Sequence, residues 1–123
     1  MGKYKQTYML FDWVLVNEVP FQVQSLTKKK IGIHKTPTAM SYVRLHDVEP
    51  VTLTEEVLYK NGYLLTDEYQ GYKQFYNSED KVGIMFSGIG FYVVINNTIR
   101  HLNYVHEVQH MYEWRGIEKQ WVI

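Results

Sequence analysis

Short turn-rich separators cut residues 63–100 at close intervals, and this pattern constrains the fold more than any other feature of the sequence. Between them lie five short segments rich in aromatic and β-branched residues, as is typical of strands. The segments are 63–66, 72–76, 81–86, 91–95 and 98–100, and the separators are 67–71, 77–80, 87–90 and 96–97. Connections this short favour tight turns between neighbouring antiparallel strands. The sequence therefore predicts an antiparallel β-meander here.

The first third of the chain also has the pattern of short strands. Apolar and polar residues alternate in 9–16 and in 21–26, and Asn17-Glu18 is expected to form the turn between them. Two more short strands are predicted at 31–34 and 41–45, joined through Thr-Pro-Thr at 36–38. Four such strands predict a small SH3-like sheet or barrel. Residues 46–50 are expected to be a connector.

Two helices are predicted. In the first, Thr54 is suited to the N-cap, Glu55 and Glu56 follow in the first turn, and Asn61-Gly62 ends the helix. The second, over 101–115, has an apolar stripe at helical spacing and stops at Gly116. Its stripe consists of Leu102, Val105, Val108, Gln109 and Tyr112, and its opposite face collects Asn103, His106, Glu107, His110, Glu113 and Trp114.

These elements together predict an α+β fold: an SH3-like N-terminal sheet or barrel, a short helix, a meander and a C-terminal amphipathic helix. The length of 123 residues suits a single domain over 1–123 with a modest core. We divide it into a β-rich part at 1–48 and a part at 49–123 that holds the helices and the meander. The apolar tail, 117–123, is expected to form an edge strand or a contact with another subunit.

The composition narrows the class of protein. Thirteen basic residues balance thirteen acidic ones, which argues against strong non-specific binding to nucleic acid or to anionic membranes. The chain has no cysteine, which fits a reducing cytosol, and its first residues lack the shape of a signal peptide. The eleven tyrosines have two interpretations, an amphipathic cover for a small sheet or a contact surface for a flat ligand or a partner protein.

The predicted second helix carries the only string typical of catalysis, His106-Glu107-Val108-Gln109-His110, which matches HExxH. Histidines four apart share a helix face, so His106 and His110 can reach one zinc ion, and the glutamate can act as general base. No third histidine follows, and an upstream ligand such as His34, His46 or Asp47 is left open. We interpret the string as a chance match on a solvated face. We therefore predict no catalytic residue, no metal and no cofactor.

Three stretches resemble a group of small uncharacterised proteins from phages and mobile elements of gut anaerobes. They are DWVLVN at 12–17, EPVTLTEEVLYKNGY at 49–63 and YVHEVQ at 104–109. The group has patterns close to "EPIPLTEEILLKNGF" and "YVHQLQNLY", with Gln often at the position of Glu107 and Asn at that of His110. Such members lack HExxH. The resemblance implies the cytosol of an infected or element-carrying bacterium as the setting, and it brings no assigned activity.

The leading hypothesis is a non-enzymatic binding module, an accessory or anti-defence protein that binds a host protein or sequesters a small nucleotide-like ligand. Arginine and histidine can hold a phosphate or a carboxylate, and tyrosine can stack on a base. The candidate ligand-binding residues are Arg44, His46, Arg100, Asn103, Tyr104, His106 and His110. A homo-oligomer is left open, and no membrane partner is expected.

Two alternatives rank behind it. The first is nucleic-acid binding, to which Lys28, Lys29, Lys30, Lys35, Tyr42 and Arg44 could contribute, although the neutral net charge weighs against it. The second is an HExxH zinc hydrolase with His106 and His110 as metal ligands.

Overall fold

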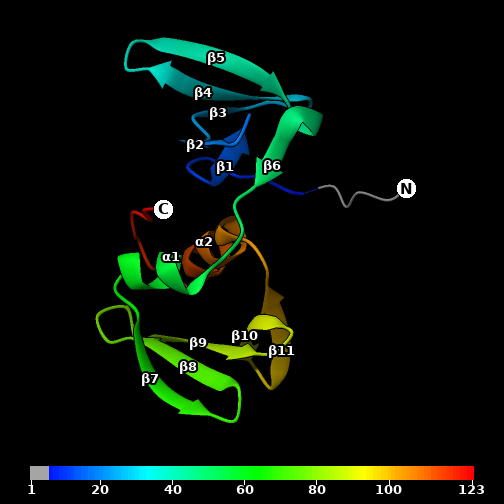
Figure 1. The fold of residues 1–123 in the computed structure, drawn as a ribbon. Helices are drawn as coiled ribbons and strands as arrows, with labels where there is room; N and C mark the ends of the chain where they lie inside the picture. Colours follow the sequence, from blue (N-terminus) through cyan, green and yellow to red (C-terminus); the bar gives the residue numbers. More distant parts are fainter. Residues whose placement is uncertain (1–5) are drawn as a thin grey trace. The chain divides into compact units, whose positions relative to one another are not determined.

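The structure is a computed structural model that describes residues 6–123. The chain forms two compact units (Figure 1). Unit 1 is Met1–Val51, and unit 2 is Thr52–Ile123. Strands predominate, and two α-helices both belong to unit 2, so the α+β class is confirmed. The division falls close to the end of the predicted β-rich part, while the single-domain interpretation stays a prediction.

Unit 1 consists of two three-stranded antiparallel sheets. The first has the order β2-β1-β6 and the second β3-β4-β5. The strands are β1 (Trp13–Val16), β2 (Val19–Gln22), β3 (Ser25–Leu26), β4 (Lys30–Thr36), β5 (Ala39–Arg44) and β6 (Val48–Pro50). A short 3-10 helix, Leu45–Asp47, joins β5 to β6. The core between these elements collects Tyr8, Val14, Val16, Val23, Ile31, Ile33 and Val48.

The first predicted strand, 9–16, is four residues shorter than expected. Phe11 has a positive φ of 69°, and the carboxylate of Asp12 accepts a hydrogen bond from the Met9 amide at 2.7 Å. The hydrogen bond from the nearby backbone to the Asp12 side chain stabilises a local turn in place of an extended strand, as is common for aspartate. The predicted Asn17-Glu18 turn is confirmed, because both residues have positive φ between β1 and β2.

The prediction of a connector at 46–50 was wrong for its second half. Val48–Pro50 forms strand β6, which pairs antiparallel with β1 so that Val16 lies opposite Val48. The strand is only three residues long and ends at a proline, so its sequence lacks a recognisable strand pattern. This pairing places the last strand of unit 1 beside its first strand, so that β1 lies between β2 and β6 in the sheet.

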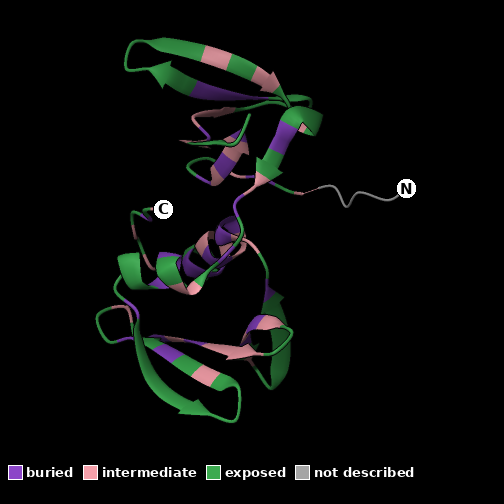
Figure 2. Ribbon diagram, in the orientation of Figure 1, coloured by how far each residue is buried: buried purple, intermediate pink, exposed green. Residues whose placement is uncertain are grey.

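Unit 2 contains the predicted meander. Five strands have the order β11-β10-β9-β8-β7, so each strand pairs with its neighbour in sequence. They are β7 (Leu64–Tyr69), β8 (Tyr72–Asn77), β9 (Val82–Ser87), β10 (Gly90–Ile95) and β11 (Thr98–Leu102). One face is buried and contributes Phe75, Ile84, Phe91 and Val93 to the core of unit 2. Figure 2 shows buried and exposed positions alternating along β8. We call the opposite side of this sheet the outer sheet face.

Two helices complete unit 2, α1 (Glu55–Lys60) and α2 (Val105–Trp114). The predicted cap of α1 is confirmed, because the Thr54 hydroxyl accepts a hydrogen bond from the Val57 amide at 3.2 Å. A glycine with positive φ lies two residues after the last residue of each helix, Gly62 after α1 and Gly116 after α2. Each glycine and the residue that follows it donate backbone hydrogen bonds to carbonyls in the last turn of the helix, as in a Schellman motif.

The second helix begins four residues later than the predicted 101–115. His101 and Leu102 belong to β11, where His101 lies opposite Tyr92. Leu102 is buried as predicted, but from a strand. Thr52 and Tyr104 then form an isolated bridge, and the Leu53 amide donates to the Asn103 carbonyl at 3.0 Å. These backbone bonds keep the chain extended up to Tyr104.

The C-terminal tail packs within unit 2 and not as the predicted edge strand. Trp121 is only 3% exposed, and its ring packs against those of Tyr63 and Tyr112 at 6.3 and 5.0 Å between centroids. The Asn61 side chain donates to the Val122 carbonyl at 2.7 Å and accepts from the Val122 amide at 2.9 Å. Irregular backbone can pack here because Asn61 satisfies the polar groups that a strand partner would otherwise pair.

Candidate functional site

The seven predicted site residues fall in two groups. Arg44 and His46 belong to unit 1, at the end of β5 and in the 3-10 helix. The others belong to unit 2, on β11, on α2 or between them, and they are Arg100, Asn103, Tyr104, His106 and His110.

The prediction that His106 lies on a solvated helix face was wrong. His106 is 2% exposed, its ring stacks on Tyr104 at 5.8 Å with planes 9° apart, and it meets His110 edge-on at 5.4 Å. The buried residues of α2 include Val105, His106 and Met111, which spread over a wider arc than the stripe of one packed face. The helix is therefore covered on more than one side at its N-terminal end.

Glu107, which would be the general base of an HExxH site, caps the start of α2. Its carboxylate oxygen Oε1 accepts hydrogen bonds from the amides of Asn103 at 2.8 Å and Tyr104 at 2.9 Å. It is the third residue of the helix, the position from which a glutamate reaches back to the N-cap amide. The prediction that Glu107 points outward with the two histidines was wrong, because the unpaired amides before the helix attract its carboxylate.

Among residues 6–123, no three or more His, Cys, Asp or Glu side chains gather in a way that could hold a metal ion. His106 and His110 are close together, yet no carboxylate or third imidazole completes a set with them in that part of the chain. A zinc site needs three or four such ligands. The described residues therefore do not fit a zinc ion at this string.

The remaining predicted residues of unit 2 have contacts within the fold. The Arg100 guanidinium lies over the Trp114 ring, 5.2 Å from its centroid, which joins β11 to the end of α2. The Asn103 amide donates to Glu107 at the start of α2, and its carbonyl accepts from the Leu53 amide. Tyr104 is the N-cap residue and the stacking partner of His106. These contacts tie β11 to α2 and shape the helix start, while Arg100 and Asn103 remain exposed.

Unit 2 also contains a buried polar cluster that sequence reasoning missed. The hydroxyls of Tyr63 and Tyr112 are 2.6 Å apart, and Tyr112 donates to Asp80 at 2.8 Å. Lys119 pairs with the same carboxylate at 2.9 Å and ties the tail to the cluster. Burial raises the pKa of both tyrosines well above the ordinary phenol value. Both therefore remain protonated donors at neutral pH, and the cluster has a structural role.

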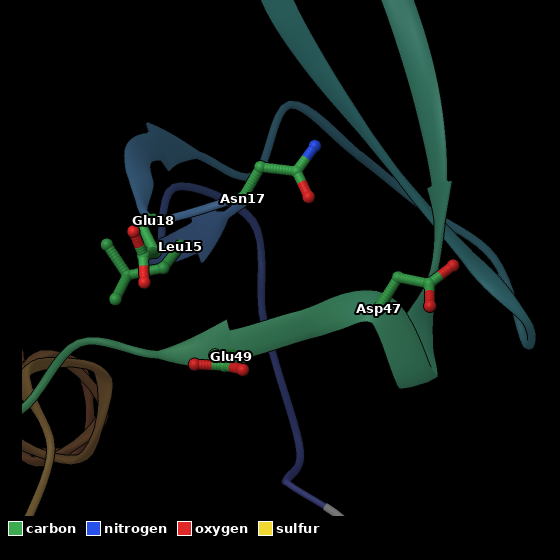
Figure 3. Close-up of a pocket in the computed structure, with 5 residues that line it drawn as sticks. All are labelled: Leu15, Asn17, Glu18, Asp47 and Glu49. Carbon is green, nitrogen blue, oxygen red and sulfur yellow. The ribbon is translucent and has the colours of Figure 1, made fainter.

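Unit 1 presents two adjoining shallow hollows. One, of about 410 Å³, is lined by Leu15, Asn17, Glu18, Asp47 and Glu49 (Figure 3). The other, of about 460 Å³, shares Asn17, Asp47 and Glu49 with it and adds Val16, Lys35, Tyr42, Val43, Arg44 and His46. We call the two together the unit 1 hollow. The β1–β2 turn, the 3-10 helix and β6 supply its shared wall.

The unit 1 hollow is lined by charged side chains of both signs. Arg44 Nε lies 3.3 Å from one carboxylate oxygen of Asp47, and His46 Nε2 lies 3.4 Å from the other. All three side chains are about half exposed or more, so the pairs are worth about 1 kcal/mol or less. Lys35 adds one positive charge, and Glu18 and Glu49 add two negative charges.

The structure thus brings together Arg44 and His46, two of the residues predicted for ligand binding. Sequence reasoning missed Asn17, Glu18 and Glu49, which line the same hollow. Asn17 and Glu18 were predicted only as a turn, and Glu49 only as part of a connector. A signal was available in Asn17-Glu18, because polar residues at a tight turn often lie on a binding surface.

Comparisons with known protein families, with curated proteins and with solved structures find no match for this chain. Within residues 6–123, none of the helices combines the length and the apolar character needed to cross a bilayer. The function is therefore inferred from the geometry of the two units.

Proposed function

We propose that this chain is a non-enzymatic binding module of a phage or mobile element, and that it acts in the host cytosol on a host protein. The first support comes from the topology of unit 1. Its two three-stranded sheets, the 3-10 helix before β6 and the pairing of β6 with β1 support the predicted SH3-like arrangement. Such barrels serve as recognition scaffolds in unrelated proteins.

The observation that carries the proposal is the unit 1 hollow. Charged, amide and aromatic side chains from three separate segments converge there, among them Asn17, Tyr42 and Arg44. No group in the hollow has the pairing of nucleophile and base that catalysis would need among the described residues. A surface of this kind offers hydrogen bonds and paired charges to a complementary protein surface.

The same hollow fits a protein better than a nucleotide-like ligand. Small-molecule sites usually enclose most of the ligand surface in a concave and largely apolar pocket. This hollow is shallow, and the Asp47 carboxylate already lies beside both Arg44 and His46. A phosphate would have to compete with that carboxylate, whereas a protein partner can offer charges of both signs.

The test compares capture of host proteins by the purified full chain and by two variants. The paired change Arg44→Ala/His46→Ala removes two of the basic side chains of the hollow, and Arg115→Ala in unit 2 is the matched control. We expect a captured protein to bind the wild type and the control alike and the paired variant at least tenfold more weakly in titrations with purified partner. Equal binding by all three chains would contradict the proposal.

One observation favours a second candidate function, nucleic-acid binding. The exposed face of β4 and β5 pairs Lys30 with Arg44 and holds Tyr42, 58% exposed, opposite Gly32. Neither strand contains a carboxylate, and Lys28 and Lys29 precede β4. The neutral net charge conceals an uneven distribution: residues 1–51 have seven Lys and Arg against four Asp and Glu, and residues 52–123 have six against nine.

A salt-dependent gel shift with single-stranded RNA and DNA tests this second function. Phosphate contacts predict binding that weakens steeply as salt rises, and base stacking predicts a loss on Tyr42→Ala. Tyr59→Ala, at a similarly exposed tyrosine in unit 2, is the matched control. Absence of binding at low salt would exclude this function.

A further inference from the structure

We infer that the outer sheet face of unit 2 is a dimerisation surface that binds the same face of a second copy of this chain. This face is the side of the β7–β11 sheet opposite the buried core residues. In an antiparallel sheet, directly paired residues and every second residue along a strand lie on one face. The large apolar residues exposed on it are Leu64, Tyr69, Tyr72, Tyr76, Val94 and Ile99.

The register places these residues on one continuous surface. Leu64 pairs with Tyr76, Tyr69 pairs with Tyr72, and Val94 pairs with Ile99. Met85 and Tyr92, a further pair on the central strands, link the two sides of the face. The outer positions of these described strands include no lysine and no arginine. The face therefore gathers many of the tyrosines into one aromatic and aliphatic surface.

Complementary polar groups at the two edges of the face identify a second copy as the occupant. A single cross-strand row runs Asp67, Gln74, Met85, Tyr92 and His101 through all five strands. Its two ends carry the only Asp and His of the outer positions. A two-fold axis along β9, the central strand, places β7 of one copy over β11 of the other. Each Asp67 carboxylate then lies over the His101 imidazole of the other copy, which can donate a hydrogen bond to it, and no like charges meet.

The size of the face is consistent with a dimer of modest stability. Five strands about 4.8 Å apart and about 20 Å long give a face on the order of 500 Å². Two such faces together reach about 1,000 Å², the lower limit for a specific interface. A nucleic-acid ligand fits poorly here, because phosphate binding requires lysine or arginine and the outer positions have neither. Sheets packed face to face are also a common arrangement of β-proteins.

Sedimentation velocity over a concentration series of the full chain tests this inference. We expect a concentration-dependent dimer, and Ile99→Lys should raise its dissociation constant about tenfold or more because the new ammonium group must lose its hydration. Ile89→Lys is the matched control, since Ile89 is 85% exposed at the β9–β10 turn and lies outside the paired rows. Tyr72→Lys is a second variant on the face, in case Ile99→Lys unfolds.

A charge exchange tests the two-fold arrangement itself. Asp67→Lys should weaken the dimer, and the double exchange Asp67→Lys/His101→Asp should restore the dissociation constant to within about threefold of the wild type. Failure of the double exchange to restore it would overturn the two-fold pairing. A chain that stays monomeric at all concentrations, or a dimer equally insensitive to Ile99→Lys and Tyr72→Lys, would overturn the inference.

Discussion

Replacement of Asn61 by alanine should release the C-terminal tail of unit 2. The Asn61 side chain makes three hydrogen bonds: it donates to the carbonyls of Val57 at 2.8 Å and Val122 at 2.7 Å, and it accepts from the Val122 amide at 2.9 Å. A hydrogen bond of this kind contributes a net of about 1 kcal/mol. The expected loss in the free energy of unfolding is therefore about 2–3 kcal/mol, because the tail bonds are only part-buried and water replaces some of them.

Trp121 provides a second way to release the same tail. Its burial against Tyr63 and Tyr112 predicts a loss of about 3–5 kcal/mol for Trp121→Ala. Because either change frees the tail, the two losses should overlap, and the double variant should lose at least about 1 kcal/mol less than their sum.

Urea denaturation followed by circular dichroism measures these losses, and the exposed Asn103→Ala is the control, with an expected change within about 0.5 kcal/mol. A loss below about 0.5 kcal/mol for Asn61→Ala, or strict additivity with Trp121→Ala, would refute the reasoning.

Three further predictions follow from local geometry. Glu107→Ala should destabilise the start of α2 by about 1 kcal/mol, while Glu107→Gln keeps an acceptor and should lose less than half of that in urea denaturation; equal losses would contradict the capping role. Below pH 10 the buried phenols of Tyr63 and Tyr112 should leave stability unchanged. Above pH 10 the unfolded chain loses protons that the folded chain retains, since burial raises the pKa of both groups, and stability should fall by about 1 kcal/mol per pH unit for each phenol. Tyr112→Phe should make this alkaline fall less steep in thermal melts, and an unchanged slope would count against it. Gly32→Ala should cost about 1–3 kcal/mol, because the new Cβ would lie 2.8 Å from Met40 Sδ and neighbouring atoms must move; a neutral result in the same denaturation assay would show that they move freely.

The meander and the first helix were predictable because their signals are local. Turn residues at short intervals specify antiparallel neighbours, and Thr54 with two glutamates marks a helix start. Strand β6 and the start of α2 were not predictable in this way. Val48–Pro50 is a strand only because β1 lies beside it, and His101 and Leu102 pair with β10 although their pattern also fits a helix. Non-local pairing decided both segments.

The candidate site was predictable only in part. Arg44 and His46 do line the unit 1 hollow, but their neighbours Asn17 and Glu18 are almost thirty positions away in the sequence. The burial of His106 was missed for a related reason. A periodic stripe shows which face of a helix is apolar, and it does not show how many sides of the helix the fold covers.

The place of Glu107 at the third position of α2 gives a criterion that applies to other chains. A glutamate in the first turn of a helix has unpaired amides within reach just behind it, and once it binds them it turns away from the side that its two neighbouring histidines share. An HExxH string at the very beginning of a helix therefore favours a helix boundary, whereas the hydrolytic role requires at least one more helical turn upstream. Motif searches that also record the distance to the nearest helix start would separate the two cases.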